Sequence, residues 1–216
     1  MVIVMYKNIL FVLYSQKLMT IFLLISGIFI FSSLFIFQQT IVNKAIAQVQ
    51  NQGSTTLLNY SNPTYEIKMQ YPKDWTASTS GIPSYNGIIG FYSPLQDLSD
   101  VLPAELTLSI TTYSKAISLD EYTKTTLGAL EKQGIAVDES SPTTLAGKPG
   151  HKVTFSPPSP AAQKAPVNLK VMQTWTVIGN KVYLLSFSAE SSKFTTNLPI
   201  AQKIIDSLKI QPPPSV

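Results

Sequence analysis

The sequence predicts an α+β domain in which helices flank a mainly antiparallel sheet. Segments that alternate apolar and polar residues, as half-buried strands do, follow one another directly within residues 57–210. The dipeptide Gly179-Asn180 joins two of them by a two-residue connection typical of a tight antiparallel hairpin. Only two segments, 118–134 and 197–208, have helical periodicity, which is too few for a sheet of alternating parallel strands and helices.

Four strands are expected before the first helix. The first covers 65–71, where one face is apolar and Pro72 ends the pattern; the apolar residues are Tyr65, Ile67, Met69 and Tyr71. Trp75 follows a turn and is predicted to lie in the core. Short strands at 76–80 and 88–92 come next. A fourth half-buried strand carries Leu106, Leu108 and Ile110.

The first helix has the clearest start and end signals in the chain. Ser118 and Glu121, three positions apart, are the pair that forms a capping box, and Gly134 suits the left-handed position after a helix. Its apolar stripe consists of Leu119, Tyr122, Leu127 and Leu130.

Strands dominate again after this helix. They are expected at 135–139, at 151–155 after a turn over 145–150, at 169–178 and at 181–188, with an irregular proline-rich loop over 156–166. The closing helix starts near Asn197 or Leu198, with Pro199 in its first turn, where the missing N–H costs nothing. Its apolar stripe is Leu198, Ala201, Ile205 and Leu208.

The N-terminal region predicts export across a membrane. Residues 18–37 carry no charge and are long enough to cross a bilayer, and Lys7 and Lys17 precede them. By the positive-inside rule, the rest of the chain is extracytoplasmic. Residues 1–47 are either a signal peptide cleaved after Ala45-Ile46-Ala47 or a retained membrane anchor. A flexible tether (48–56), the domain (57–210) and a disordered proline-rich tail (211–216) follow.

Composition excludes several kinds of site. The chain has no Cys, so disulfides, thiolate nucleophiles and zinc–thiolate sites are ruled out. After Ala47 there are thirteen lysines against twelve acidic residues, a net charge of +1. With no arginine to form bidentate contacts, this balance argues against a nucleic-acid partner.

The order of elements and the residues at its corners resemble the PsbP family, the oxygen-evolving enhancer proteins of photosystem II. The segments that carry the resemblance are YEIKMQYPKDW (65–75), GFYSP (90–94), 173–187 and the helix end IIDSL (204–208). It covers about residues 57–210. It implies an α/β/α sandwich around an antiparallel sheet and a non-enzymatic extrinsic subunit that helps to retain calcium and chloride; a relative of the same fold binds the Ran GTPase. The leader and the use of lysine as the only basic residue fit a prokaryotic member of the family, bacterial or archaeal, better than a plant member.

Few residues are candidates for chemistry. Asp97, Asp100 and Glu105 are short-spaced oxygen ligands that could hold calcium, as the resemblance also allows. They lack the regular spacing and glycine turn of a tight loop, which favours a solvated acidic loop and, at best, calcium binding near the millimolar range. The only histidine, His151, has no second histidine or cysteine to support a metal or general-base role, so a structural role is favoured.

Two functions therefore stand as hypotheses, and neither is enzymatic, because no catalytic motif is present. The first is a non-catalytic extracytoplasmic module that binds an unidentified protein partner or supports a membrane-associated complex. The alternative is an extracytoplasmic protein that binds a small ligand or a metal such as calcium, in a cleft near 156–166. The segment Asn59-Tyr60-Ser61 is also a glycosylation sequon.

Overall fold

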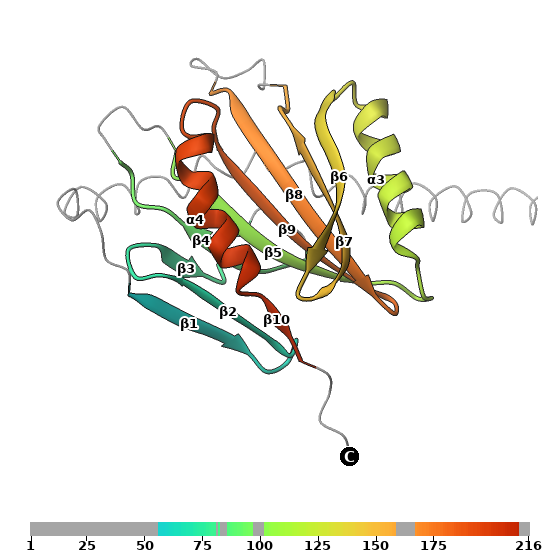
Figure 1. Ribbon diagram of the computed structural model, residues 1–216, viewed down its shortest axis with the longest axis horizontal. Helices are drawn as coiled ribbons and strands as arrows, with labels where there is room; N and C mark the ends of the chain where they lie inside the picture. The colour runs from blue at the N-terminus through green and yellow to red at the C-terminus, as the bar shows by residue number, and fades with distance from the viewer. Residues whose placement is uncertain (1–55, 81, 83–85, 97–101, 159–166, 212–216) are drawn as a thin grey trace, which may run out of the picture.

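The computed structural model describes residues 56–80, 82, 86–96, 102–158 and 167–211. This part of the chain forms ten strands and two helices (Figure 1). The first half contains β1 (Leu57–Asn62), β2 (Ile67–Pro72), β3 (Thr76–Ser78), β4 (Gly87–Tyr92), β5 (Glu105–Thr112) and α3 (Leu119–Lys132). The second half contains β6 (Val137–Leu145), β7 (Lys148–Phe155), β8 (Leu169–Ile178), β9 (Lys181–Glu190), α4 (Phe194–Asp206) and β10 (Lys209–Ile210).

The strands form two sheets, and neighbouring strands pair antiparallel in both. The larger sheet has seven strands in the order β3-β4-β5-β9-β8-β7-β6. The smaller has three in the order β1-β2-β10, and it lies at the lower left of Figure 1. The mainly antiparallel α+β fold predicted from the sequence is therefore confirmed.

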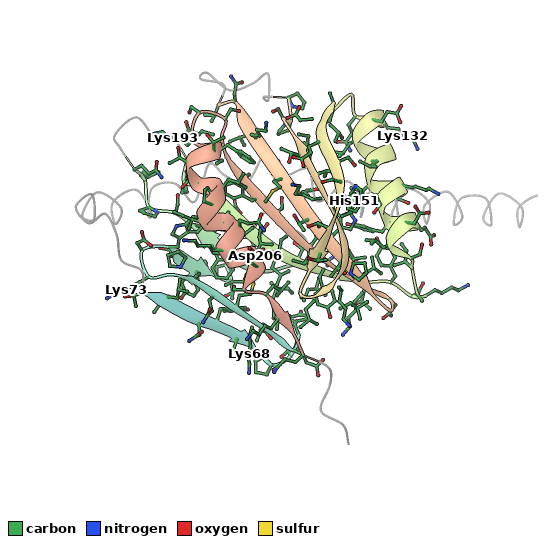
Figure 2. All side chains as sticks on the ribbon, in the orientation of Figure 1. Lys68, Lys73, Lys132, His151, Lys193 and Asp206 are labelled. Atoms are coloured by element: carbon green, nitrogen blue, oxygen red, sulfur yellow. The ribbon has the colours of Figure 1, made fainter. Side chains whose placement is uncertain are left out.

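The two helices cover opposite faces of the larger sheet, as the alternation along β9 shows. Tyr183, Leu185 and Phe187 pack in a core with α4 and the three-stranded sheet. Val182 and Leu184 belong to a second core, under α3. Because successive side chains of a strand point to opposite faces, the sheet is a middle layer between the helices. Side chains fill the space between these layers (Figure 2).

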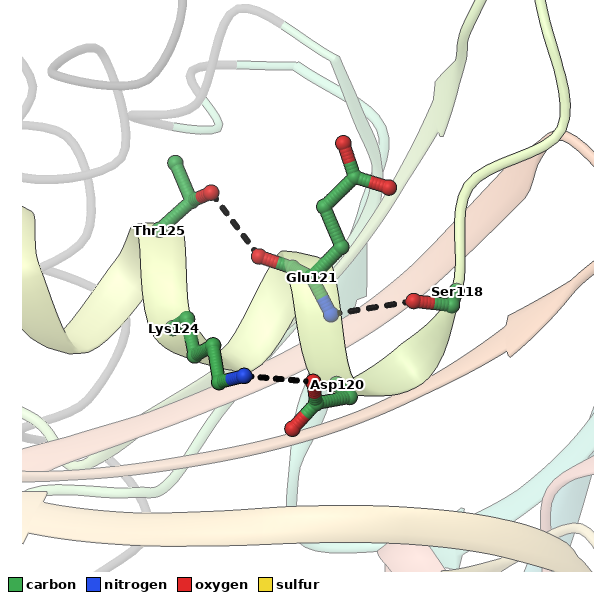
Figure 3. Close-up of polar contacts among 5 residues, drawn as sticks. All are labelled: Ser118, Asp120, Glu121, Lys124 and Thr125. Atoms are coloured by element: carbon green, nitrogen blue, oxygen red, sulfur yellow. Dashed lines mark hydrogen bonds and ion pairs between the residues drawn. The ribbon is translucent and has the colours of Figure 1, made fainter.

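Helix α3 begins as predicted. The backbone N–H of Glu121 donates to Oγ of Ser118 over 3.1 Å, and Lys124 pairs with Asp120 at 2.9 Å (Figure 3). Gly134 has a φ of +70°, the left-handed conformation expected after the helix. Leu130 is fully buried, and Leu119, Tyr122 and Leu127 pack against the same core.

Helix α4 begins earlier than predicted. It starts at Phe194, so Pro199 lies inside the helix and not in its first turn. A proline there removes one hydrogen bond to the carbonyl four residues earlier. Phe194 is buried, with its ring centroid 5.1 Å from that of Phe187. We attribute the early start to this contact, which sequence periodicity did not reveal.

Near the first strand, two features differ from the prediction. Tyr65, expected on the buried face, lies in the β1–β2 turn and is exposed. Oδ1 of Asn62 accepts hydrogen bonds from the backbone N–H groups of Thr64 and Tyr65, and this turn delays the strand to Ile67. Strand β1 was not predicted, whereas the burial of Ile67 and Met69 is confirmed.

The predicted strand 135–139 and turn 145–150 also need correction. Strand β6 continues to Leu145, and the turn consists only of Ala146 and Gly147, whose φ values are +51° and +72°. Positive φ at both central positions is typical of a type I′ hairpin. The polar sequence of β6 hid it, because this edge strand buries few residues.

The predicted leader (1–47) and tail residues 212–216 lie outside the described residues, as does the predicted tether (48–56) except for Thr56. Neither α3 nor α4 is long and apolar enough to be a membrane span, and the search was limited to the part of the chain described here.

Trp75 offers a test of the larger core. It is 4% exposed and packs in the core beside α4. We expect Trp75→Ala to lower the free energy of unfolding by about 3–5 kcal/mol, the range for a buried tryptophan. Trp75→Phe, which keeps an aromatic ring, should recover part of the loss. Urea denaturation measures both; a loss below about 1 kcal/mol for the alanine variant would contradict this assignment.

Candidate functional site

Of the predicted calcium ligands, the structure describes only Glu105, because Asp97 and Asp100 lie outside the described residues. Glu105 begins β5, directly opposite Tyr92 on β4. Its Oε1 is buried without a hydrogen-bond partner in the described part of the chain. Within that part, no group of three His, Asp or Glu side chains is arranged to hold a metal. The calcium site of Asp97, Asp100 and Glu105 therefore stays a prediction.

The carboxyl group of Glu105 is a buried acid. Burial raises its pKa to about 7, although a hydrogen bond from the Tyr92 hydroxyl opposes this shift. The pKa of Tyr92 is raised well above its ordinary value, mainly by burial and to a smaller extent by the nearby carboxylate of Glu105. The pair is therefore neutral in mildly acidic conditions.

The raised pKa predicts a pH-dependent stability. Between the ordinary pKa of 4.5 and about 7, folded Glu105 keeps a proton that the unfolded chain has lost. The free energy of unfolding should therefore fall by about 1–3 kcal/mol as pH rises through this interval. Glu105→Gln cannot ionise, so its unfolding free energy should lack this decrease. Urea denaturation below pH 4.5 and above pH 7 tests it; equal decreases in both proteins would contradict the assignment.

His151 lies on β7, where its ring packs against Trp175 with centroids 5.4 Å apart. Its Nε2 shares a hydrogen bond of 2.8 Å with Oγ of Ser140 on β6. The indole N–H of Trp175 donates to Oγ1 of Thr123 on α3, so the cluster joins helix and sheet. Burial lowers the pKa of His151, which favours the neutral imidazole.

Sequence reasoning missed the pairing of Ser140 with His151, because serines are too common to single one out. A serine and a neutral histidine resemble a nucleophile and its base. In an enzyme, such a pair catalyses acyl transfer only when a third group orients the histidine and N–H donors stabilise the oxyanion that forms on the substrate. The ring of His151 packs against Trp175, a buried core residue, and this contact favours a packing role.

A shallow groove of about 370 Å³ lies between the β6–β7 turn and the α4–β10 junction. Its residues are Thr144–Gly147, Ile205, Asp206 and Leu208–Ile210. Leu145, Ile205 and Leu208 form a buried apolar floor, and Asp206 and Lys209 are exposed at the rim. This groove is not the cleft predicted near 156–166, of which residues 159–166 lie outside the described part.

Strand β1 presents a backbone edge that no other described strand covers. Within the described part of the chain, β1 pairs only with β2. The N–H of Lys73 donates to the carbonyl of Thr56 over 3.0 Å. The backbone groups of Thr56 therefore point toward β2, and this sets the alternation along β1. In an antiparallel pair, every second residue turns both its N–H and its C=O outward. Leu57, Asn59 and Ser61 are the residues of β1 that do so.

The edges of the two sheets differ in protection. Strand β6 carries Asp138, Glu139 and Pro142, which are features that discourage pairing with another strand. Strand β3, at the other edge of the larger sheet, has only three residues. The sequence of β1, LLNYSN, contains neither a charge nor a proline, and Leu57 and Leu58 are 49% and 38% exposed. Strand β1 is therefore the least protected of these edges.

Comparison with known proteins gives likeness in structure only. No family model and no curated protein sequence matches the chain. LpqN of Mycobacterium tuberculosis, described as involved in cell envelope biogenesis, is 22% identical, with 68% of this chain and 83% of LpqN covered and a TM-score of 0.51. A protein of Bacteroides thetaiotaomicron is 16% identical over 73% of this chain, with a TM-score of 0.51; the match spans 49% of that protein's length. Cyanobacterial PsbP from Synechocystis is 13% identical, with coverages of 75% and 96% and a TM-score of 0.48.

The chain has a mainly antiparallel α+β fold of the kind found in LpqN and in the Bacteroides protein. The antiparallel sheet with its two helices and the likeness to solved structures agree on this. At these identities the comparisons show the fold alone, and ligand and partner must be argued from the chain's own residues.

Proposed function

We propose that this chain is a non-catalytic extracytoplasmic module that binds a protein partner, as part of a membrane-associated complex, by pairing through β1. The observation that carries the proposal is the uncharged edge formed by Leu57, Asn59 and Ser61, which no other strand among the described residues covers. An extended segment of a partner can add to such an edge, because main-chain hydrogen bonds supply affinity and alternate side chains supply specificity.

The side chains along this edge favour an extended, partly apolar partner segment. Leu57 and Leu58 expose apolar surface at one end of β1, and Tyr65 does so in the turn at the other end. Asn59 and Ser61 lie between them and are exposed without charge. A partner strand with one apolar residue at each end and small polar residues between them would match this order.

The small-ligand hypothesis rests on the groove beside Asp206 and Lys209. It is open and combines an apolar floor with one charge of each sign at the rim. The β1 edge is the stronger candidate, because an unprotected edge calls for a covering partner, whereas a shallow groove does not.

A proline at position 59 tests the proposal. Asn59→Pro removes an outward N–H without removing an inward one, so it blocks strand addition. Asn59→Ala is the matched control, since both variants lose the bond from Nε2 of Gln70 to Oδ1 of Asn59 and both lose the sequon. From solubilised membranes, the tagged full chain and the alanine variant should capture the same stoichiometric partner, and the proline variant should capture at least about tenfold less.

Two further measurements make this test decisive. Circular dichroism should show that both variants are folded, and amide exchange at Leu57 and Ser61 should slow when the purified partner is added. Equal capture by the two variants would exclude the β1 edge. A bound small molecule in place of a protein partner would favour the alternative function.

A further inference from the structure

The face of the three-stranded sheet that points away from the core is cationic. The strand register places Leu57, Asn59, Ser61, Lys68, Gln70 and Lys209 on this outer face. Their neighbours Tyr60, Ile67 and Met69 point the other way and pack in the core. No acidic residue occupies an outward position on these three strands, because the segments contain none.

Lys68 and Lys209 lie directly opposite each other on β2 and β10. Like charges at such a position are unfavourable unless an anion lies near both. The ion pairs between described residues involve Lys124, Lys152 and Lys170, all outside the three-stranded sheet. The Lys68–Lys209 pair thus forms a two-charge site for an external anion, at the side of the molecule where Figure 2 labels Lys68.

The predicted course of the chain brings this face near a bilayer. If residues 18–37 are retained as an anchor, the tether 48–56 ends at Leu57, on the outer face itself. Residues 38–56, which join that anchor to Leu57, span at most about 65 Å when fully extended, so the membrane surface stays within reach of the sheet. Leu57 is 49% exposed at the point where the tether joins the domain.

We propose that the outer face of the three-stranded sheet lies on an anionic membrane surface. The ammonium groups of Lys68 and Lys209 contact lipid phosphates, and Leu57 enters the boundary between headgroups and acyl chains. This inference rests on the extracytoplasmic, membrane-associated function proposed above. Two lysines bind a membrane weakly, but a tethered domain needs only weak contacts to become oriented, because its effective concentration at the surface is high.

A single-cysteine experiment tests this orientation, since the natural chain contains no cysteine. Ser61→Cys on the outer face and Ser191→Cys near Lys193, at the opposite end of α4 from Asp206 (Figure 2), each receive an environment-sensitive dye. The unprocessed full chain is inserted into vesicles of phosphatidylcholine alone or with about 30% phosphatidylglycerol, an anionic lipid. Nitroxide-labelled headgroups then quench any dye near the surface.

Strong quenching is expected at Ser61→Cys in anionic vesicles, and little in zwitterionic vesicles or at Ser191→Cys. The double change Lys68→Gln with Lys209→Gln should lower the ratio of docked to undocked domain about 30-fold, corresponding to about 1 kcal/mol for each lysine. Lys115→Gln with Lys132→Gln, which removes two exposed charges elsewhere, should leave the quenching unchanged.

Other results overturn the proposal. Equal quenching at the two dye positions, or quenching that survives loss of Lys68 and Lys209, rules out docking through this face. If the double lysine change abolishes partner capture and leaves quenching unaltered, the lysines contact an acidic protein and not lipid. By contrast, loss of partner capture in Asn59→Pro with quenching retained supports the proposal, because membrane docking then does not depend on the β1 edge.

Discussion

Burial of the seven-stranded sheet on both faces is the constraint on which the rest of the structure depends. Strand β9 is at its centre: Tyr183, Leu185 and Phe187 enter one core, and Val182 and Leu184 the other. A sheet with two apolar faces needs a cover on each side. Helix α4 covers one face together with the three-stranded sheet, and α3 covers the other. In the part of the chain that the structure describes, the smaller sheet packs on the core by one face and is bonded at its β2–β10 side, so the outer side of β1 stays without a strand partner.

Besides the shared apolar core, the hydroxyl group of Ser207 joins the end of α4 to the backbone of the three-stranded sheet. The N–H of Gln70 donates to Oγ of Ser207 over 2.8 Å, at the C-terminal end of α4. Beyond it, β10 adds only Lys209 and Ile210 to the ladder with β2. The hydroxyl of Ser207 thus bonds Gln70 of β2 where a longer β10 would otherwise continue the ladder. The side toward β10 is satisfied in this way, so strand addition is left to the outer edge of β1.

The sequence predicted those elements whose apolar pattern directly reflects burial. Strand β8, the Gly179-Asn180 hairpin and the start of α3 were placed correctly, because periodicity and cap residues act locally. Strands β1 and β6 were missed or shortened, since each is an edge that buries few side chains. The start of α4 depends on Phe194 meeting Phe187, a contact that no local pattern encodes.

The candidate surfaces were still harder to predict, for a related reason. Glu105 was singled out from the sequence as a candidate calcium ligand, but the burial that raises its pKa depends on pairing between β4 and β5. The opposition of Lys68 and Lys209 depends on β10 returning to β2 from the far end of the domain. Composition shows which charges are present, and only the register shows which of them meet.

Asn59 connects the proposed edge and the proposed membrane face. Its backbone N–H points along the sheet, toward an added strand, and its side chain accepts a bond from Gln70 on the outer face. A glycan on this asparagine would therefore extend from the face and not from the edge. It would hold the outer face away from a bilayer, while leaving the backbone of β1 accessible to a partner strand. With the outer face on a membrane, the same edge points parallel to the bilayer, where a partner in or on that membrane can reach it. Docking through Lys68 and Lys209 and a sugar at Asn59 thus exclude each other, and strand addition is compatible with either.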